Sequence, residues 1–452
     1  MYSYSLNNFQ YNNYNTAKPV RATATENEMP VSKPSFTSNP VIKQVPYNAA
    51  FTASALRTQL VSDDEKNKYN TLIKIADKET RKNLNILLKS GILLNTDSND
   101  KSATLDNLYL LATTQRAQGL DNAVLLHDTV QTLAQPHVVT QQFGNIPKQF
   151  MAKTVALGNG EDVNVEHSGT CPAASIEFNL AQKHPAEFAR FANGLSSPEM
   201  SVKKTIKLSN LADNTLDAIW LLNAFEIPYK ADNFNEAELT FAPDKNALVR
   251  AYFQTIDRDK QERSSIDVLM QSTFMNVGSQ QSYNTLTDKR AGKFNQNPKG
   301  LIEFEKTFTE SVVEDKNKIS VTYQKIDENA KLVGYETDFN TMKKQIVEAL
   351  NMGDNVIIGY TQTDNTNTIV NGHEITIIGA KTDKQGKMTF ICHDTDDGQS
   401  KPVEYSEDFL LPKIHHAGLP QSVAEKEMNV KENWVEGLET YKELKKQYRN
   451  AA

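Results

Sequence analysis

Residues 167–176 read His-Ser-Gly-Thr-Cys-Pro-Ala-Ala-Ser-Ile, and this stretch is the most informative about the fold. Its small residues permit a tight turn at Gly169, and Pro172 suits the first position of a helix, where no amide donor is required. The apolar residues that follow, as far as Ala181, predict a helix with a strongly apolar face. Cys171 is therefore expected at the N-terminus of a buried helix, where the helix dipole and unpaired amides stabilise a thiolate. The segment alone also fits a cysteine that is only a small buried apolar side chain.

A second informative stretch is 371–380, which reads Asn-Gly-His-Glu-Ile-Thr-Ile-Ile-Gly-Ala. Its β-branched residues predict a strand that His373 opens. A turn around Gly386 then reverses the chain into a second strand, which ends at Asp394. Because these two ends of an antiparallel hairpin lie side by side, the imidazole of His373 and the carboxylate of Asp394 can meet.

A thiol at a helix N-terminus, a histidine on a strand and an acid on the partner strand make a nucleophile, a general base and an orienting group. His373 would accept the thiol proton and later protonate the leaving group. Asp394 would select the tautomer of the imidazole and favour its cationic form. An ion pair of this kind lowers a cysteine pKa from about 8.5 into the range of about 3.5 to 7.5. We therefore predict a lowered pKa for Cys171.

In these segments the chain resembles the papain-like cysteine peptidase superfamily, and more closely its bacterial double-glycine, bacteriocin-processing peptidase-like domains. That branch has a helix start with Cys, Pro and Ser, then a helix–glycine–strand unit, a Gly-His strand, and a strand that ends in Asp or Asn. The matching segments here are 169–175, 338–360, 372–379 and 387–394. The resemblance implies an α+β fold with a central helix and an antiparallel sheet, and a catalytic triad of Cys171, His373 and Asp394.

The sequence departs from the family pattern in three ways. The long interval between the cysteine and the histidine implies an insertion at about 199–335. No glycine separates Cys171 from Pro172. The family also carries an upstream glutamine whose side chain helps a backbone amide to bind the oxyanion. We assign this role to Gln141, with Gln142 as the alternative, although both lie farther from the cysteine than in the plant enzymes.

The acidic partner of His373 has several candidates, because four residues that can orient an imidazole lie together: His393, Asp394, Asp396 and Asp397. Alternate residues of a strand face opposite sides, so either Asp394 or His393 points toward His373. The family pattern favours Asp394. The acidic loop would also suit calcium, but it lacks the regular alternation of acidic positions of known calcium loops.

The rest of the chain frames this region. Residues 1–50 are rich in Asn, Tyr, Ser, Thr and Pro, and a segment with so few aliphatic side chains is predicted to be disordered. The spacing of apolar residues predicts a helical bundle over 51–135, preceding the catalytic domain at 136–420. Interleaved opposite charges predict an exposed, charged helix over 421–452.

Composition excludes several classes of protein. Lys and Arg number 49 against 56 Asp and Glu, and the net charge of −7 lacks the basic excess of a nucleic-acid-binding protein. No run approaches the roughly 18 apolar residues of a transmembrane helix. The two cysteines exclude a disulfide framework. The N-terminus lacks the basic start and apolar segment of a secretory signal, so we expect cytoplasmic residence or export without a standard signal peptide.

We expect neither a metal nor a cofactor. A zinc site requires clustered Cys and His ligands, and Cys171 and Cys392 lie in unrelated contexts. His415 and His416 have no acidic or thiol partner near them in the sequence, so a surface or structural role is expected. His167 precedes the cysteine closely enough to line a cleft, but an exposed loop position is the simpler expectation.

The predicted activity is acyl transfer by a cysteine nucleophile through a thioester, with a peptide or protein as substrate. A peptidase is the first expectation. Two alternatives stay open: a deamidase, amide hydrolase or transglutaminase-like enzyme with the same triad, or a catalytically inactive papain-like binding protein. The triad does not specify whether water or an amine accepts the acyl group. Oligomeric state leaves no pattern in the sequence.

Overall fold

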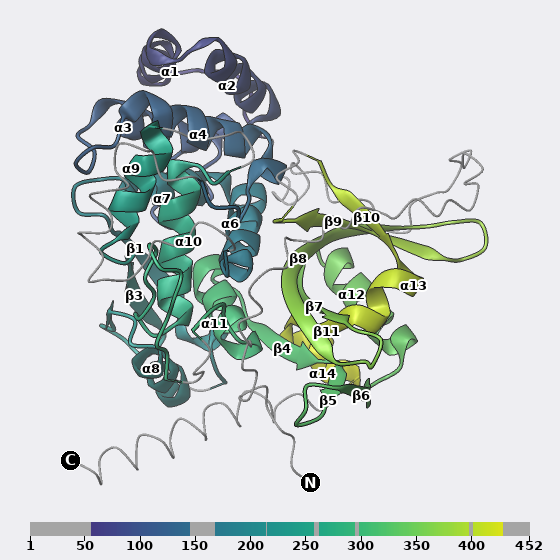
Figure 1. The fold of residues 1–452 in the computed structure, drawn as a ribbon. Helices are drawn as coiled ribbons and strands as arrows, with labels where there is room; N and C mark the ends of the chain where they lie inside the picture. Colours follow the sequence, from purple (N-terminus) through teal and green to yellow (C-terminus); the bar gives the residue numbers. More distant parts are fainter. Residues whose placement is uncertain are drawn as a thin grey trace, which may run out of the picture.

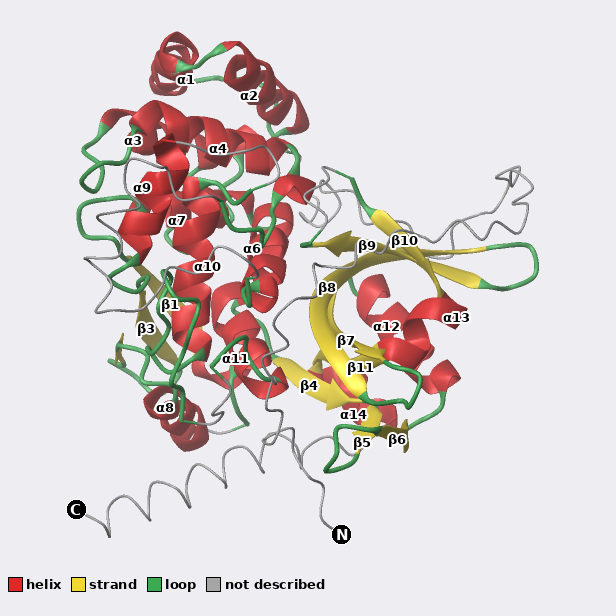
Figure 2. Cartoon of the chain, in the orientation of Figure 1, coloured by secondary structure: helices red, strands yellow, loops and turns green. Residues whose placement is uncertain are grey.

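Helices gather on one side of the molecule and a large antiparallel sheet on the other (Figure 1). The computed structural model describes residues 56–144, 168–213, 215–256, 262–293, 298–396 and 401–427. The segment 1–50 and most of the predicted C-terminal helix at 421–452 lie outside these residues. The mixed α+β class expected from the sequence is confirmed (Figure 2). Every pair of neighbouring strands described is antiparallel.

The helical half is built from segments that precede the large sheet in the chain. Its α-helices are α1 (Asp63–Ile75), α2 (Lys78–Ser90), α3 (Thr104–Thr113), α4 (Asn122–Ala134), α6 (Cys171–Lys183), α7 (Pro185–Leu195), α8 (Thr215–Ala224), α9 (Ala247–Ile256), α10 (Ser265–Gly278) and α11 (Glu303–Glu314). A small sheet of β1 (Val202–Lys207), β2 (Tyr229–Lys230) and β3 (Glu236–Phe241) has the order β1-β3-β2. None of the described helices has both the length and the apolar character that a membrane crossing requires.

The local sequence explains where several of these helices begin and end. Ser62 caps α1 in a capping box with Glu65, which pairs two backbone donors that the helix would otherwise leave free. Gly91 ends α2 in a left-handed conformation with φ of 80°, which costs a glycine little. Ser264 and Asp267 form a second capping box at the start of α10. These signals are local, so they can be seen in the sequence before any tertiary contact is known.

One apolar core runs through the whole helical half. Leu108 of α3 and Leu126 of α4 belong to the same buried cluster as Ile176 of α6 and Phe274 of α10. Helices α3 and α7 pack together, as do α4 and α10. The helices of the predicted bundle at 51–135 therefore share their core with the helices that follow, because their apolar faces are covered by α7 and α10.

The large sheet has the order β10-β9-β8-β7-β11-β4. Its strands are β4 (Lys318–Thr322), β7 (Val356–Thr363), β8 (Ile369–Thr382), β9 (Met388–Asp394), β10 (Val403–Ser406) and β11 (Ile414–Pro420). The further elements of this half are the hairpin of β5 (Gln324–Ile326) and β6 (Leu332–Tyr335) and the helices α12 (Phe339–Asn351), α13 (Glu407–Leu410) and α14 (Gln421–Glu427). The predicted helix at 338–351 is confirmed as α12, which Asp338 caps with its side chain.

The large sheet is covered by helices on two sides. Ile375 and Ile377 of β8 share a core with Met342 and Ile346 of α12. Ile378 of the same strand instead packs in the cluster that contains Phe178 of α6. In Figure 1, α6 accordingly lies at the edge of the helical half that faces the sheet, whereas α12 lies on the side of the sheet away from α6.

The stretch 199–335, which was expected to be an insertion, contributes directly to this body. Its helices α10 and α11 pack against α6, and its strand β4 forms one edge of the large sheet through pairing with β11. Burial of α6 on all sides therefore depends on residues from this stretch as well as on the large sheet.

Candidate active site

Cys171 is the first residue of α6. The N-cap residue Thr170 makes no side-chain cap, and the first helical hydrogen bond runs 2.9 Å from the Ala174 N–H to the Thr170 carbonyl. The amides at the start of a helix have no partner within it, so they are available to a negative charge placed there. The predicted buried helix that begins at Cys171 is confirmed, since Pro172 to Lys183 are all buried.

The turn before Cys171 is held from α10 and from the segment after it. The Gly169 N–H donates to Asp288 Oδ2 at 2.7 Å, and Thr170 Oγ1 donates to Gln271 Oε1 at 2.8 Å. A Cβ atom on Gly169 would lie 2.9 Å from the Gly300 nitrogen, so only glycine fits without a shift of backbone. The position of Cys171 is therefore determined by these buried polar contacts as well as by the helix.

His373 and Asp394 meet across the β8–β9 hairpin. The register pairs Ile375 with Asp394, and His373 Nε2 lies 2.8 Å from Asp394 Oδ1. β8 begins at Ile369, upstream of the predicted start at His373, so the histidine lies within the strand. Asp394 is held in turn by the Tyr405 hydroxyl, which donates to its Oδ2 at 3.0 Å.

The other candidates for the acidic partner occupy different places. Asp396 Oδ2 is 3.7 Å from His373 Nε2, and its side chain is half exposed. His393 is fully buried and stacks on Phe178, with ring centroids 4.0 Å apart. Asp397 lies outside the described residues. The contact of 2.8 Å thus favours Asp394 over Asp396 as the residue that orients the imidazole.

The thiol of Cys171 completes the arrangement. It lies beside the imidazole of His373 and the backbone of Glu374, and both act to lower its pKa. Because Nε2 of His373 faces Asp394, Nδ1 is the ring nitrogen left for the thiol. The structure thus brings together a helix start, a strand and a strand end that are far apart in the sequence.

Burial and charge shift the pKa values of His373 and Asp394 in opposite directions. Burial lowers the pKa of His373, but the charge of Asp394 and its hydrogen bond raise it more, to well above 6.5. Burial favours the neutral acid for Asp394, yet the His373 charge brings its pKa down to about 2. The pair is therefore an ion pair at neutral pH.

Burial also raises the pKa of Cys171, and the hydrogen bond and charge of His373 offset this only in part. The predicted lowering of the Cys171 pKa is wrong in direction. Removing a thiolate from water costs more here than the imidazolium returns.

The two glutamines proposed for the oxyanion lie beside the acidic loop. Gln141 donates from its side chain to the carboxylate of Asp396, and its backbone N–H donates to the Thr395 carbonyl at 3.0 Å. Gln142 donates from Nε2 to the carbonyl of Asp396 at 3.1 Å. Both side chains therefore contact Asp396, whose carboxylate lies 3.7 Å from His373 Nε2.

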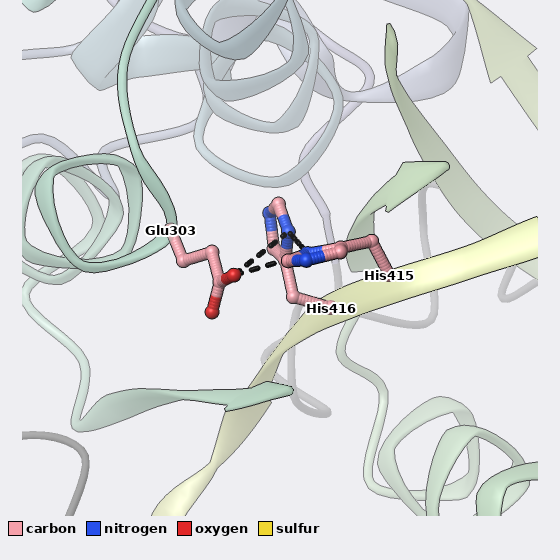
Figure 3. Close-up of side chains that lie close together, drawn as sticks. All are labelled: Glu303, His415 and His416. Carbon is pink, nitrogen blue, oxygen red and sulfur yellow. Dashed lines mark hydrogen bonds and ion pairs between the residues drawn. The ribbon is translucent and has the colours of Figure 1, made fainter. Parts of the chain in front are cut away.

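Sequence reasoning missed a second polar cluster. His415 and His416 are buried, and both ring Nδ1 atoms face Glu303 at the start of α11 (Figure 3). His416 also lies 2.9 Å from Glu374. A surface position for these histidines is therefore wrong, and their acidic partners come from segments that are remote in the sequence. His167 lies outside the described residues.

The described geometry places a thiol at a helix start beside an imidazole that Asp394 orients. These are the parts needed for attack on a carbonyl carbon. The group of His373, Asp394 and Asp396 also has the ligand spacing of a metal site. Comparisons with protein-family models, with curated proteins and with solved structures found no match to this chain.

Proposed function

We propose that the protein is a cysteine-nucleophile acyl-transfer enzyme that hydrolyses peptide bonds. The observation that carries this proposal is the convergence of the Cys171 thiol at the start of α6, the His373 imidazole and Asp394, whose Oδ1 lies 2.8 Å from Nε2. An ion pair with a purely structural role needs only the contact between His373 and Asp394. A thiol placed at a helix start, on the other nitrogen of the same buried imidazole, serves the transfer of a proton.

In the proposed reaction, His373 Nδ1 accepts the thiol proton and Sγ attacks the substrate carbonyl carbon. The oxyanion is stabilised by the free amides at the start of α6, with Gln141 as a side-chain donor if its contact with Asp396 is exchanged. His373 then protonates the leaving amine, and a thioester with Cys171 remains. Water, deprotonated by His373, hydrolyses the thioester and restores the thiol.

The raised pKa values define when the site is reactive. Cys171 and His373 both have raised pKa values, so the resting pair holds two protons at neutral pH. Loss of one proton leaves either the thiolate–imidazolium or the thiol–imidazole form, and these belong to the pair rather than to one residue. Activity is therefore expected to rise toward alkaline pH.

A papain-like arrangement is part of the proposal. It is supported by the origin of the three residues: α6 in the helical half supplies the thiol, and the antiparallel strands β8 and β9 of the large sheet supply the histidine and the acid. This is the arrangement that the sequence resemblance implies.

Hydrolysis is tested with a mixture of denatured proteins incubated with the purified enzyme and read by mass spectrometry. We expect new peptide N-termini with the wild type and with Cys392→Ala, and none with Cys171→Ala or His373→Gln. A mass shift of about one dalton on intact backbones would instead identify a deamidase, and amine crosslinks a transferase. Equal cleavage by Cys171→Ala would refute the proposal of a cysteine nucleophile.

A further inference from the structure

His415 and His416 are adjacent in β11, where neighbouring side chains ordinarily face opposite sides of a sheet. A register shift between Ile414 and His416 interrupts the pairing of β11 with β7 at this point. Such an irregularity re-aims side chains, and here the two Nδ1 atoms lie 3.1 Å apart (Figure 3). The strand thus directs both rings to one place.

Three potential ligand atoms converge there. Glu303 Oε1 is 3.0 Å from His415 Nδ1 and 4.0 Å from His416 Nδ1. A tetrahedral zinc ion with bonds of about 2.0–2.1 Å holds its ligand atoms about 3.3–3.5 Å apart. The three observed separations bracket this spacing, so an ion near the centre of the triangle would reach all three atoms.

Hydrogen bonding alone does not satisfy this triangle. His416 Nε2 lies 2.9 Å from Glu374 Oε1, so a ring proton on Nε2 would face that carboxylate and leave the lone pair of Nδ1 for the triangle. His415 Nδ1 carries at most one proton, which it can donate either to Glu303 or to His416. One of the three contacts therefore stays unpaired unless a cation occupies the centre.

The surrounding residues orient the ligand atoms as outer-shell partners do. Contact of a ligating imidazole with a carboxylate through its second nitrogen is typical of metal sites, and Glu374 supplies it for His416. Thr322 Oγ1 donates to Glu303 Oε2 at 2.6 Å, which leaves Oε1 for the ion.

The sheet leaves room for the imidazole. Gly359 pairs with Glu374 on one side and with His416 on the other. A Cβ atom at Gly359 would overlap the His416 ring and lie 2.8 Å from Glu374 Oε1. The absence of a side chain in β7 therefore creates the space that this cluster occupies.

We propose that Glu303, His415 and His416 bind one divalent transition-metal ion, with Zn²⁺ as the best fit and a fourth position open to water. Two imidazoles and one carboxylate suit zinc, whereas magnesium and calcium prefer all-oxygen ligands. Glu303 and Glu374 both contact the histidines, and Lys306 Nζ lies 3.5 Å from Glu374 Oε2, so carboxylates adjoin the ligand atoms from two sides.

The ion would connect the two halves of the molecule beside the triad. Glu303 begins α11, which packs against α6, and both histidines belong to β11 of the large sheet. Glu374, which orients His416, directly follows His373 in β8. The site would therefore hold the helix that carries the thiol against the sheet that carries the base, whichever reaction the triad performs.

The test is a titration of chelator-treated, full-length protein with Zn²⁺, with metal content measured by mass spectrometry and Co²⁺ used as a spectroscopic substitute. We expect one Zn²⁺ per chain and the visible absorption of tetrahedral Co²⁺. Glu303→Gln and His416→Ala should each abolish both signals, and Glu374→Gln should weaken affinity about 10- to 100-fold. Because His416→Ala opens a gap in the core, Glu303→Gln is the conservative variant, and circular dichroism of the apo forms verifies folding.

Two matched controls separate this site from other groups. His137 Nδ1 lies 3.2 Å from His393 Nδ1, a similar pair of imidazoles that no third described ligand joins, so His137→Ala should bind zinc like the wild type. Asp396→Asn removes a member of the active-site group and should also retain one ion. The proposal is overturned if the wild type binds no Zn²⁺ or if folded Glu303→Gln binds it unchanged. It is also overturned if Asp396→Asn loses the ion while the Glu303 and His416 variants retain it.

Discussion

Single residues in this protein differ sharply in the environments that decide their chemistry. The two cysteines illustrate this, because Cys392 is fully buried in the core between the large sheet and α12, whereas Cys171 is partly accessible at the start of α6. Burial raises the pKa of both thiols, but only Cys171 has a neighbouring imidazole that acts in the opposite direction. The reactivity of the Cys171 thiol should therefore depend on His373. The Cys392 thiol should react only when the protein unfolds.

Alkylation of Cys171 by iodoacetamide should reflect these pKa directions. Because burial raises its pKa, we expect the rate to climb only above the ordinary thiol range, near 9, as pH increases and the thiolate forms. His373→Gln removes the charge that lowers the pKa of Cys171, so the midpoint should move to higher pH. The rate at pH 8 should then fall about tenfold for every 1.0 by which that pKa rises. Peptide mass spectrometry measures both cysteines in the same sample.

Cys392 is the internal control for this experiment, and it should stay unmodified while the protein is folded. His137→Gln serves as a control variant at a partly buried histidine, and its Cys171 profile should equal that of the wild type. An unchanged profile in His373→Gln would contradict an effect of the imidazole on the Cys171 thiol.

Among the elements, α6 and its contact with the large sheet decide the geometry of the site. Phe178 is fully buried, stacks on His393 and shares a cluster with Ile378 of β8. Replacing it with alanine should lower the free energy of unfolding by about 3–5 kcal/mol, because a large cavity opens between helix and sheet. In a smaller fraction of molecules the Cys171 thiol would then contact His373. The pH profile of Cys171 alkylation should therefore move toward that of His373→Gln.

A matched substitution distinguishes positioning from general destabilisation. Phe225 is fully buried and stacks on Phe308 within the helical half, with centroids 3.6 Å apart. Phe225→Ala should cost a similar free energy of unfolding, measured by denaturant titration, yet leave the Cys171 profile unchanged well below the midpoint of unfolding. Identical profiles for Phe178→Ala and Phe225→Ala would mean that the contact between α6 and β8 does not position the thiol.

For the molecule as a whole, the continuous core of the helical half predicts shared stability. Leu126 of α4 is fully buried, and its replacement by alanine should cost about 2–5 kcal/mol. Because α4 packs on α10 and α6, hydrogen exchange measured by mass spectrometry should accelerate in those helices as well as in α4. The exposed Leu110 in α3 offers a control whose substitution by alanine should change little. Faster exchange confined to residues 56–135 would instead mean that this region is an independent unit.

Local patterns in the sequence were sufficient to predict the helix that starts at Cys171, the helix that ends near Asn351, and the antiparallel hairpin that leads to Asp394. These features depend on a proline, a cap or a period of apolar residues within one short segment. The mixed α+β class follows from the same signals, since each element buries the face that its own spacing creates.

Only the tertiary structure decided which remote groups meet and how strongly they are desolvated. The Glu303 cluster joins the start of α11 to β11 and, through Glu374, to β8, and its two adjacent histidines converge because of a register shift that no local spacing indicates. The raised pKa of Cys171 likewise comes from burial by helices and strands that are distant in the chain. Sequence periodicity determines which face of an element is apolar, whereas electrostatics depends on distances through space, and those exist only after the elements have packed.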